Sequence, residues 1–389
     1  MNNYLKQFIR NFDFPLFFTY LILCLFGLVM IYSSSLAVAV GRYDYAPDHF
    51  FRKQIINLTL AIPAFFVAAF FPYKNFKRKK VMMVSVIGML LLLFSVHLFG
   101  SGEHVGAKSW IRIAGISVQP SEFAKIIILI YFSSIFAVKY EKGTINSLNK
   151  SILPPVIILV LAVLSIMLET DIGTSLIIIV GAFSVIAASG INRNTFFKLS
   201  GIIVGGLSIV ALFLYFSWDS IMNGARKGRI LSYLNPFDYP DSSGFQIING
   251  YIAIGSGGLA GLGLGNSIQK MGYLPEPHTD FIMAVISEEL GLLGALIVIG
   301  GLGFIVFRAF TIALRAKDPQ ARMLAAGIGS VIGIQTFVNL GGLTGIIPIT
   351  GVPLPFISYG GTSVILTSIA VGILMNVSMF VKYEKKKTK

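Results

Sequence analysis

The sequence is poor in charge, cysteine and tryptophan. Of its 389 residues only 12% are charged, two are tryptophan and one, Cys24, is cysteine. A single cysteine excludes a fold held by disulfides. Hydrophobic residues make up 55% of the chain, which is too much for a water-soluble domain of this size. The first apolar run is long and does not end in a small-residue cleavage site, so we expect no cleavable signal peptide.

What the chain has instead is a series of long apolar runs, which is the pattern of a polytopic helical membrane protein. We predict an all-α fold in one domain over residues 1–389, with about ten transmembrane helices. A large extracellular loop, at about 218–280, is expected between the seventh and eighth helices. The predicted spans cover residues 14–36, 55–72, 81–99, 120–138, 152–168, 172–190, 199–217, 281–307, 323–343 and 361–381.

The charged residues predict the orientation of these spans. An even number of spans places both termini on one side, and most of the 31 lysines and arginines fall on that side. The positive-inside rule assigns it to the cytoplasm. The net charge of +14 is therefore mainly topological, and we expect no nucleic-acid partner. Most acidic residues lie on the opposite side, which indicates a site at the outer face of the membrane.

A cluster of ionisable side chains marks the entry to the eighth span. Glu276, His278 and Asp280 lie in a loop stiffened by prolines, and Glu288 and Glu289 follow about two turns into the span. Carboxylates facing lipid would cost several kcal/mol, so these two glutamates must face a polar cavity or a partner. Thr279 or Asp280 is expected to cap the helix. The plainer alternative is that Asp280 is only a cap and that the glutamates pack against a basic partner.

Charged residues also interrupt two earlier stretches of the chain. Lys125 lies about one turn into the fourth span, where it either pairs with Glu122 or supplies positive charge to an anionic ligand. Glu169 and Asp171 lie in a tight turn between the fifth and sixth spans. This turn either caps the sixth span or pairs with Lys125 or Arg112.

Irregular segments complete the predicted outer face. Residues 246–254 predict a weakly amphipathic helix in the membrane interface. The glycine-rich run at 255–265 is either a phosphate-cradling loop or a segment that permits close packing. Residues 339–363, which include Ser358, should wall the same cavity as Asp280, because irregular backbone at membrane depth must line a cavity or be buried in protein.

Seven of these stretches together resemble the SEDS family (shape, elongation, division and sporulation), the FtsW/RodA-type peptidoglycan glycosyltransferases. The run at 265–270 is closer to the division-type branch. The matching stretches are QPSEFAK at 119–125, DIGT at 171–174, LNPF at 234–237, IAIGSGG at 252–258, LPEPHTDF at 274–281, EELG at 288–291 and PFISYGG at 355–361.

The resemblance implies polymerisation of lipid II into glycan strands at the outer face of the bacterial plasma membrane, in septal wall synthesis. Asp280 falls on the family's outer aspartate, and we predict that it is the general base. The resemblance also implies a divalent cation, Mg²⁺ or Mn²⁺, and a class B penicillin-binding protein as partner within the division machinery. No metal ligands are predicted. The residues expected to contact lipid II and undecaprenyl-pyrophosphate-linked glycan are Lys125, Arg112, Arg229, Glu276, His278 and Ser358.

A transporter is the main alternative. A lipid II flippase would also use intramembrane charge and broken helices to carry a head group across the membrane. A carrier needs its site near the midplane, whereas the charged residues here gather at the outer edge. A scaffold that only recruits division proteins would leave the carboxylates without a task.

Overall fold

A computed structural model describes residues 9–100, 109–113, 116–147, 151–169, 171–201, 205, 232–239 and 243–387 of the chain. In this part of the chain the structure is almost entirely helical, which confirms the predicted fold class. The helices long and apolar enough to cross a membrane are α2 (Phe14–Tyr43), α3 (His49–Phe70), α4 (Lys79–Phe99), α5 (Pro120–Glu141), α12 (Ile282–Arg315), α13 (Pro319–Leu343) and α14 (Gly361–Lys387).

Two shorter apolar helices, α6 (Leu153–Leu168) and α7 (Ile172–Ala187), occupy the positions of the predicted fifth and sixth spans. Nine of the ten predicted spans therefore coincide with helices. The remaining one, at 199–217, lies largely outside the described residues. The large predicted loop is described only in part, where it holds the 3₁₀ turn η3 (Pro236–Asp238), the helix α11 (Ser243–Gly257) and the turn η4 (Gln269–Met271). α11 confirms the helix predicted at 246–254.

One small sheet departs from an all-helical fold. Strands β1 (Ile111–Ile113) and β2 (Ile116–Val118) form an antiparallel hairpin in which Arg112 lies opposite Ser117. The hydroxyl of Thr362 donates to the carbonyl of Ser117 at 2.9 Å, which joins the hairpin to the first turn of α14. The hairpin therefore lies at the end of the molecule that also holds the irregular segment before α14.

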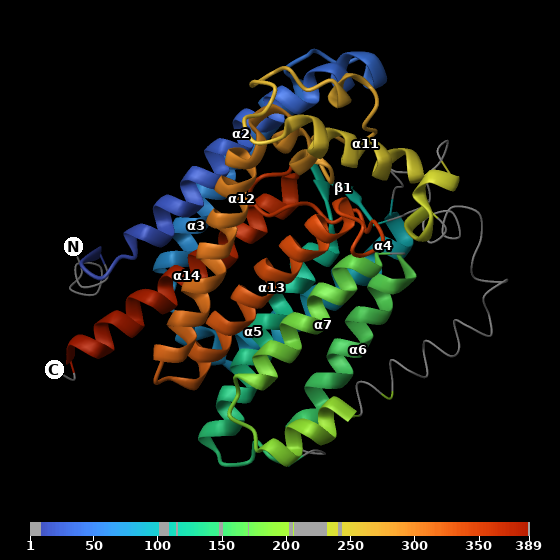
Figure 1. Ribbon diagram of the computed structural model, residues 1–389. Coiled ribbons are helices and arrows are strands. Elements are labelled where there is room, and N and C mark those ends of the chain that lie inside the picture. The colour runs from blue at the N-terminus through green and yellow to red at the C-terminus, as the bar shows by residue number, and fades with distance from the viewer. Residues whose placement is uncertain are drawn as a thin grey trace.

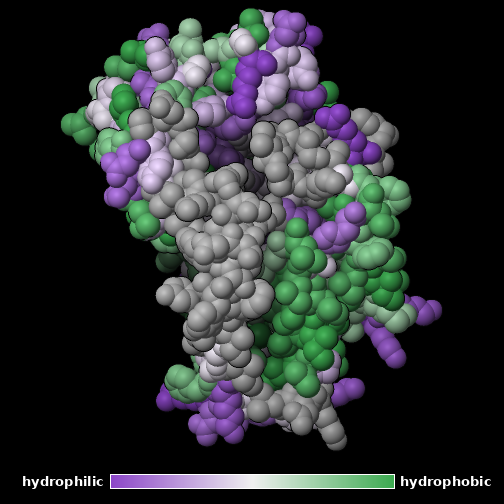
Figure 2. Space-filling model, turned by 90° about the vertical axis from the view of Figure 1, so that its right-hand side faces the viewer, coloured by the Kyte–Doolittle hydropathy of each residue, from purple (hydrophilic) through white to green (hydrophobic). Residues whose placement is uncertain are grey.

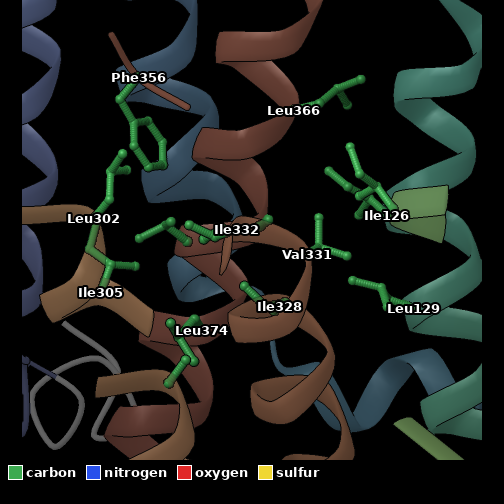
Figure 3. Packing of buried hydrophobic residues seen from close by; sticks show 14 of the residues in the cluster. Ile126, Leu129, Leu302, Ile305, Ile328, Val331, Ile332, Phe356, Leu366 and Leu374 are labelled. Atoms are coloured by element: carbon green, nitrogen blue, oxygen red, sulfur yellow. The ribbon is translucent and has the colours of Figure 1, made fainter. Parts of the chain in front are cut away.

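The core lies between α5, α12, α13 and α14, whose branched apolar side chains interdigitate in Figure 3. Of the long apolar helices, α14 and α13 are the most enclosed, with 78% and 67% of their most apolar stretch buried. The corresponding share for α4 is 22%. Large apolar side chains on α4, such as Val84 and Leu91, are exposed. Figure 2 shows hydrophobic residues over the middle of the visible surface and hydrophilic residues toward both ends. These apolar surfaces fit contact with lipid.

The start of α2 and the end of α14 lie toward the same end as the turn between α12 and α13, whereas α11 and β1 lie at the opposite end (Figure 1). Basic residues before and within α4, at the end of α12 and at the end of α14 belong to the end with the termini. The side of the membrane on which both termini lie stays a prediction.

Candidate active site

Asp280 lies in the turn that leads into α12, not in the cap of that helix. α12 begins at Ile282 with Phe281 as its N-cap residue, and the side chain of Phe281 makes no capping hydrogen bond. The prediction that Thr279 or Asp280 caps the helix is therefore wrong. The turn is closed differently, because the Phe281 amide donates to the Glu276 carbonyl at 3.3 Å and the Thr279 hydroxyl points back to Glu276.

The half-buried Asp280 borders a small hollow between the last turns of α13 and the segment that follows it. A Cβ added to Gly351 would lie 3.5 Å from Oδ2 of Asp280, so the carboxylate lies beside this segment. The residues lining the hollow are Asp280, Phe281, Val338, Asn339, Gly342, Leu343, Ile349, Thr350, Gly351 and Val352. The prediction that residues 339–363 wall the cavity of Asp280 is confirmed for their first part.

Two polar side chains of α13 hold this region together, and the sequence analysis missed both. The amide of Asn339 donates to the carbonyls of Asp280 and Val352, at 3.0 and 2.8 Å. One turn earlier, Gln335 donates to the Pro353 carbonyl at 2.9 Å and accepts a hydrogen bond from Lys125 at 2.9 Å. Two buried amides spaced four residues apart in an apolar span were the available signal.

Lys125 is buried and paired. Its ammonium group lies 2.7 Å from Oε1 of Glu122, and both side chains are at most 4% exposed. Pairing with Glu122 is the plainer of the two roles predicted for Lys125. Through Gln335 and Asn339 the same helix, α13, connects Lys125 to the turn that carries Asp280. Contact with an anionic ligand stays a prediction for Lys125.

The turn between α6 and α7 has the predicted capping role. Asp171 is the N-cap of α7, where its carboxylate accepts from the Thr174 amide at 2.9 Å. It also accepts from Gln119 and Ser121 at the start of α5, at 3.2 and 3.4 Å. Burial raises the pKa of Asp171. This carboxylate therefore joins two helix ends.

Glu169 is the neighbouring acid, and its side chain is only 3% exposed. Within the described part of the chain its carboxylate oxygens have no hydrogen-bond partner. Burial, followed by the charge of Asp171, raises its pKa to about 8. Near neutral pH the Glu169 side chain is therefore mostly protonated.

Three predicted ligand-contacting residues lie around the Asp280 turn. Glu276 accepts from Arg42 of α2 at 3.3 Å, and Ser358 donates to the Thr279 carbonyl at 2.6 Å. His278 is buried, with its ring 4.3 Å from that of Phe50 on α3. The structure thus brings Glu276, His278 and Ser358 together as supports of one turn. Their contact with substrate stays a prediction.

The two predicted arginines belong to other segments of the chain. Arg112 is exposed on β1. Arg229 lies outside the described residues.

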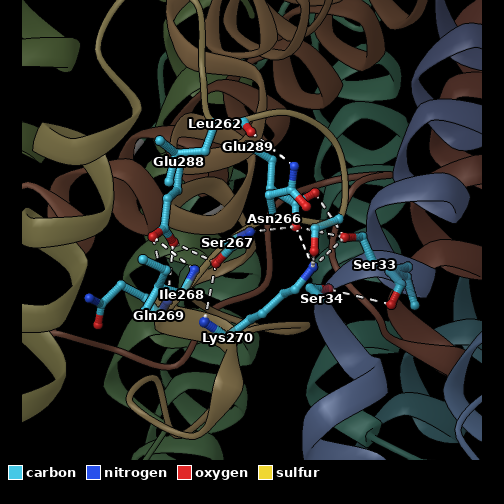
Figure 4. Close-up of polar contacts among 12 residues, drawn as sticks. Ser33, Ser34, Leu262, Asn266, Ser267, Ile268, Gln269, Lys270, Glu288 and Glu289 are labelled. Atoms are coloured by element: carbon cyan, nitrogen blue, oxygen red, sulfur yellow. Dashed lines mark hydrogen bonds and ion pairs between the residues drawn. The ribbon is translucent and has the colours of Figure 1, made fainter.

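Glu288 and Glu289 bind the loop that precedes the Asp280 turn (Figure 4). Glu288 accepts from the Ser267 hydroxyl and from the amides of Ile268 and Gln269. Glu289 pairs with Lys270 at 2.6 Å, with the two side chains 0% and 4% exposed. It also accepts from Ser33 of α2, at 2.7 Å. Both carboxylates therefore have buried partners, as one of the predicted alternatives required.

The glycine-rich run packs closely against α12. A Cβ on Gly257 would overlap the Ser287 carbonyl, and one on Gly261 would overlap the Glu289 carbonyl. The amides of Leu262 and Gly263 donate to the carbonyls of Glu288 and Glu289, both at 2.9 Å. α12 itself departs from helical geometry at Gly291, with φ of 60°. The amides that a phosphate would need are thus used for packing, and the close-packing alternative holds.

Long apolar helices that enclose a polar cluster at one end of the bundle define a polytopic membrane protein with a site at the membrane edge. The family model of FtsW, RodA and SpoVE, described as a cell cycle protein, matches residues 14–383. The chain belongs to this family, which confirms the resemblance seen in its motifs.

Similar proteins agree with this assignment. A probable peptidoglycan glycosyltransferase FtsW of Bacillus subtilis is 45% identical, over 99% of this chain and 95% of that protein. Another of the same name from Geobacter metallireducens is 38% identical over 96% of each. Both relatives carry the name of the division-type branch, to which the run at 265–270 was predicted to be closer.

A chain from a solved structure entitled "Structural coordination of polymerization and crosslinking by a peptidoglycan synthase complex" superposes with a TM-score of 0.72. It is 24% identical and the match covers 95% of this chain and 98% of that one, which supports the fold.

Proposed function

We propose that this chain is a peptidoglycan glycosyltransferase that polymerises lipid II at the outer face of the plasma membrane during septal wall synthesis. The observation that carries the proposal is the position of Asp280. Its carboxylate borders a hollow at the membrane edge, and its main-chain carbonyl is held by Asn339. Full-length similarity to FtsW proteins supports the reaction class.

In the proposed reaction, Asp280 takes the proton from the 4-hydroxyl of the acceptor's N-acetylglucosamine. The hydroxyl oxygen attacks the anomeric carbon of the donor glycan and forms the new glycosidic bond with inversion. The bond from that carbon to undecaprenyl pyrophosphate breaks, and the pyrophosphate leaves with the electron pair. A positioned base accelerates such a transfer by about 10²–10⁴-fold.

The departing pyrophosphate needs positive charge, and Lys125, Arg112 and Arg229 are the proposed sources. Lys125 is paired with Glu122 and Gln335. It would reach the pyrophosphate by exchanging one of these partners. Arg112, which is exposed on β1, would offer a guanidinium group for bidentate contact.

A divalent cation, Mg²⁺ or Mn²⁺, is proposed from the family resemblance. The described residues contain no group of three or more histidine, cysteine, aspartate or glutamate side chains placed to hold a metal. A cation would therefore take most of its ligands from substrate pyrophosphate and water, with one or two carboxylates, which is common for Mg²⁺. Such a cation would neutralise charge on the leaving group.

The proposed partner is a class B penicillin-binding protein, which would crosslink the strands together with other division proteins. The superposition with a chain from a polymerisation and crosslinking complex supports this pairing. The proposed orientation places both termini in the cytoplasm, and the distribution of basic residues supports it.

The first prediction tests Asp280 directly. Purified protein with its transpeptidase partner, labelled lipid II and Mg²⁺ should form glycan ladders. Asp280→Asn should reduce the rate at least 100-fold, because the amide cannot accept the proton. Asp48→Asn is the matched control, since Asp48 is an acid of the first predicted outer loop that pairs only with Arg52 among the contacts described.

Ladders that persist with Asp280→Asn would contradict the assigned base. Wild-type protein that moves lipid II across vesicle membranes without forming polymer would instead support the flippase.

A further inference from the structure

A basic cavity lies where the start of α2 meets the end of α14, far from Asp280 and among groups that the proposed reaction does not use. Its volume is about 430 Å³, and it is lined by Arg10, Asn11, Phe12, Lys382, Lys385 and Lys386. Four of these six residues are cationic and none is acidic. The cavity therefore presents a concentrated positive charge at the end of the molecule that holds both termini.

The nearby carboxylates are already occupied. Asp13 is fully buried, and its carboxylate accepts three hydrogen bonds from Arg308, at 2.9, 3.0 and 3.1 Å, and one from Ser378 at 2.6 Å. Glu384 pairs with Lys74, 3.8 Å away. Burial raises the pKa of Asp13, but Ser378, Lys382 and Arg308 outweigh it, so the pKa lies below its usual value. Asp13 stays charged, and it is paired with Arg308 at 2.9 Å and with Lys382 of the cavity wall at 3.3 Å.

The cavity also adjoins an apolar surface. The ring of Phe12 lies 5.3 Å from that of Phe14 and 5.6 Å from that of Phe17. Phe14 and Phe18, on the same end of α2, are 56% and 53% exposed. α2 is long and apolar enough to span a membrane. Basic residues thus lie beside an exposed aromatic surface at the level where α2 leaves the bilayer.

We propose that this cavity binds the phosphate head group of an anionic membrane lipid, whose acyl chains lie along the exposed aromatic side chains of α2. Basic pockets beside spans on the positively charged side of a membrane protein suit such head groups. A soluble phosphate would gain nothing from the aromatic surface, and an acidic protein segment would not need it. The lipid would join the first turn of α2 to the last turn of α14, independently of the proposed transferase activity.

The test measures retention of phosphatidylglycerol and of phosphatidylcholine by the purified full chain, using native mass spectrometry from detergent. Wild-type protein should retain phosphatidylglycerol in preference to phosphatidylcholine. Arg10→Gln with Lys385→Gln should weaken this retention about tenfold, because each basic side chain at an anionic surface contributes a several-fold effect. Lys382 is left unchanged, since it also contacts Asp13.

Lys79→Gln with Lys80→Gln is the matched control. It removes the same charge from exposed residues at the start of α4, outside the cavity. Equal loss of lipid in the two double variants would overturn the proposal, because binding would then follow overall charge. Displacement of the lipid by inorganic phosphate, or equal retention of both lipids, would overturn it as well. The proposal would also be overturned if the protein bound a glutamate-rich peptide through the cavity and showed no preference between the two lipids.

Discussion

Asn339 makes two hydrogen bonds that an apolar residue cannot replace. It holds the carbonyls of Asp280 and Val352 in one place, so it fixes the turn and the segment that together border the hollow. A small displacement of a catalytic group can lower a rate by about 100-fold. The position of Asp280 therefore depends on a side chain from another helix, 59 residues further along the chain.

We predict that Asn339→Ala lowers the rate of glycan polymerisation by about tenfold or more, at a stability cost of about 1–3 kcal/mol for carbonyls left unpaired. Thr336→Val on the same helix is the control, because the Thr336 hydroxyl donates only within α13, to Ile332. Initial rates and Tm should be measured together. A lower Tm with an unchanged rate would show that Asn339 supports the fold but not the position of Asp280.

Glu169 gives a pH-dependent prediction. Its pKa is about 8 in the folded state and near 4.3 in an unfolded chain. A raised pKa means that the folded state binds the proton more tightly, so this stabilisation is complete below the unfolded value. It is lost as pH rises from about 4 to about 8. The Tm of wild-type protein should therefore fall over this range, and that of Glu169→Gln should fall less. Identical pH profiles would rule out a buried, protonated Glu169.

The sequence indicated Asp280, Lys125 and Asp171 as special, because a charged residue in or beside an apolar span is rare and costly. It left open which partner each residue has, since partners 210 residues apart, such as Lys125 and Gln335, are set by helix packing. Asn339 and Gln335 carry no charge, and for that reason they drew no attention.

Among the elements, α11 and the glycine-rich run depend on contact with α12. The backbone of Gly257, the last residue of α11, lies directly against the carbonyl of Ser287. This contact leaves no room for a side chain. Two residues earlier, Gly255 has no atom within 4 Å of a Cβ position. Close packing therefore requires glycine at position 257 of α11 but not at position 255.

We predict that Gly257→Ala destabilises the protein by about 1–3 kcal/mol, because the added methyl group forces α11 away from α12. Gly255→Ala should leave Tm unchanged or raise it slightly, since alanine favours a helix by about 1 kcal/mol over glycine. Thermal unfolding of the two purified variants gives the comparison. Similar Tm values for both would show that α11 does not pack against α12 in this way.

The transmembrane helices could be predicted from the sequence. In lipid, a single apolar segment can hydrogen-bond all of its backbone groups only as a helix. The β1–β2 hairpin was not predicted, since two three-residue strands are too short to give a periodic pattern. The break of α12 at Gly291 was also missed. It depends on contact with Leu259 and Gly261, which lie about 30 residues earlier in the chain.

In the whole molecule, the distribution of basic residues predicts which end of the helix bundle faces the cytoplasm. The helices alone do not indicate this orientation. The end with both termini carries the basic cavity and the Asp13 cluster, while Asp280 belongs to the other end. Positive residues are retained in the cytoplasm during membrane insertion. The positive-inside rule therefore predicts the orientation, and this orientation would place Asp280 at the outer surface.

The orientation can be tested by cysteine labelling, because the one native cysteine is expected not to react with the reagent. Cys24 is 1% exposed in the middle of α2, so a membrane-impermeant maleimide should leave the wild-type protein unlabelled. Tyr273, which is 51% exposed in the turn leading to Asp280, becomes a reporter in Tyr273→Cys. Labelling of this variant is expected on intact cells stripped of any outer membrane. Lys80→Cys, at the exposed start of α4, should be labelled only after the plasma membrane is permeabilised. The reverse pattern would place Asp280 in the cytoplasm, where a polymerase of exported lipid II could not work.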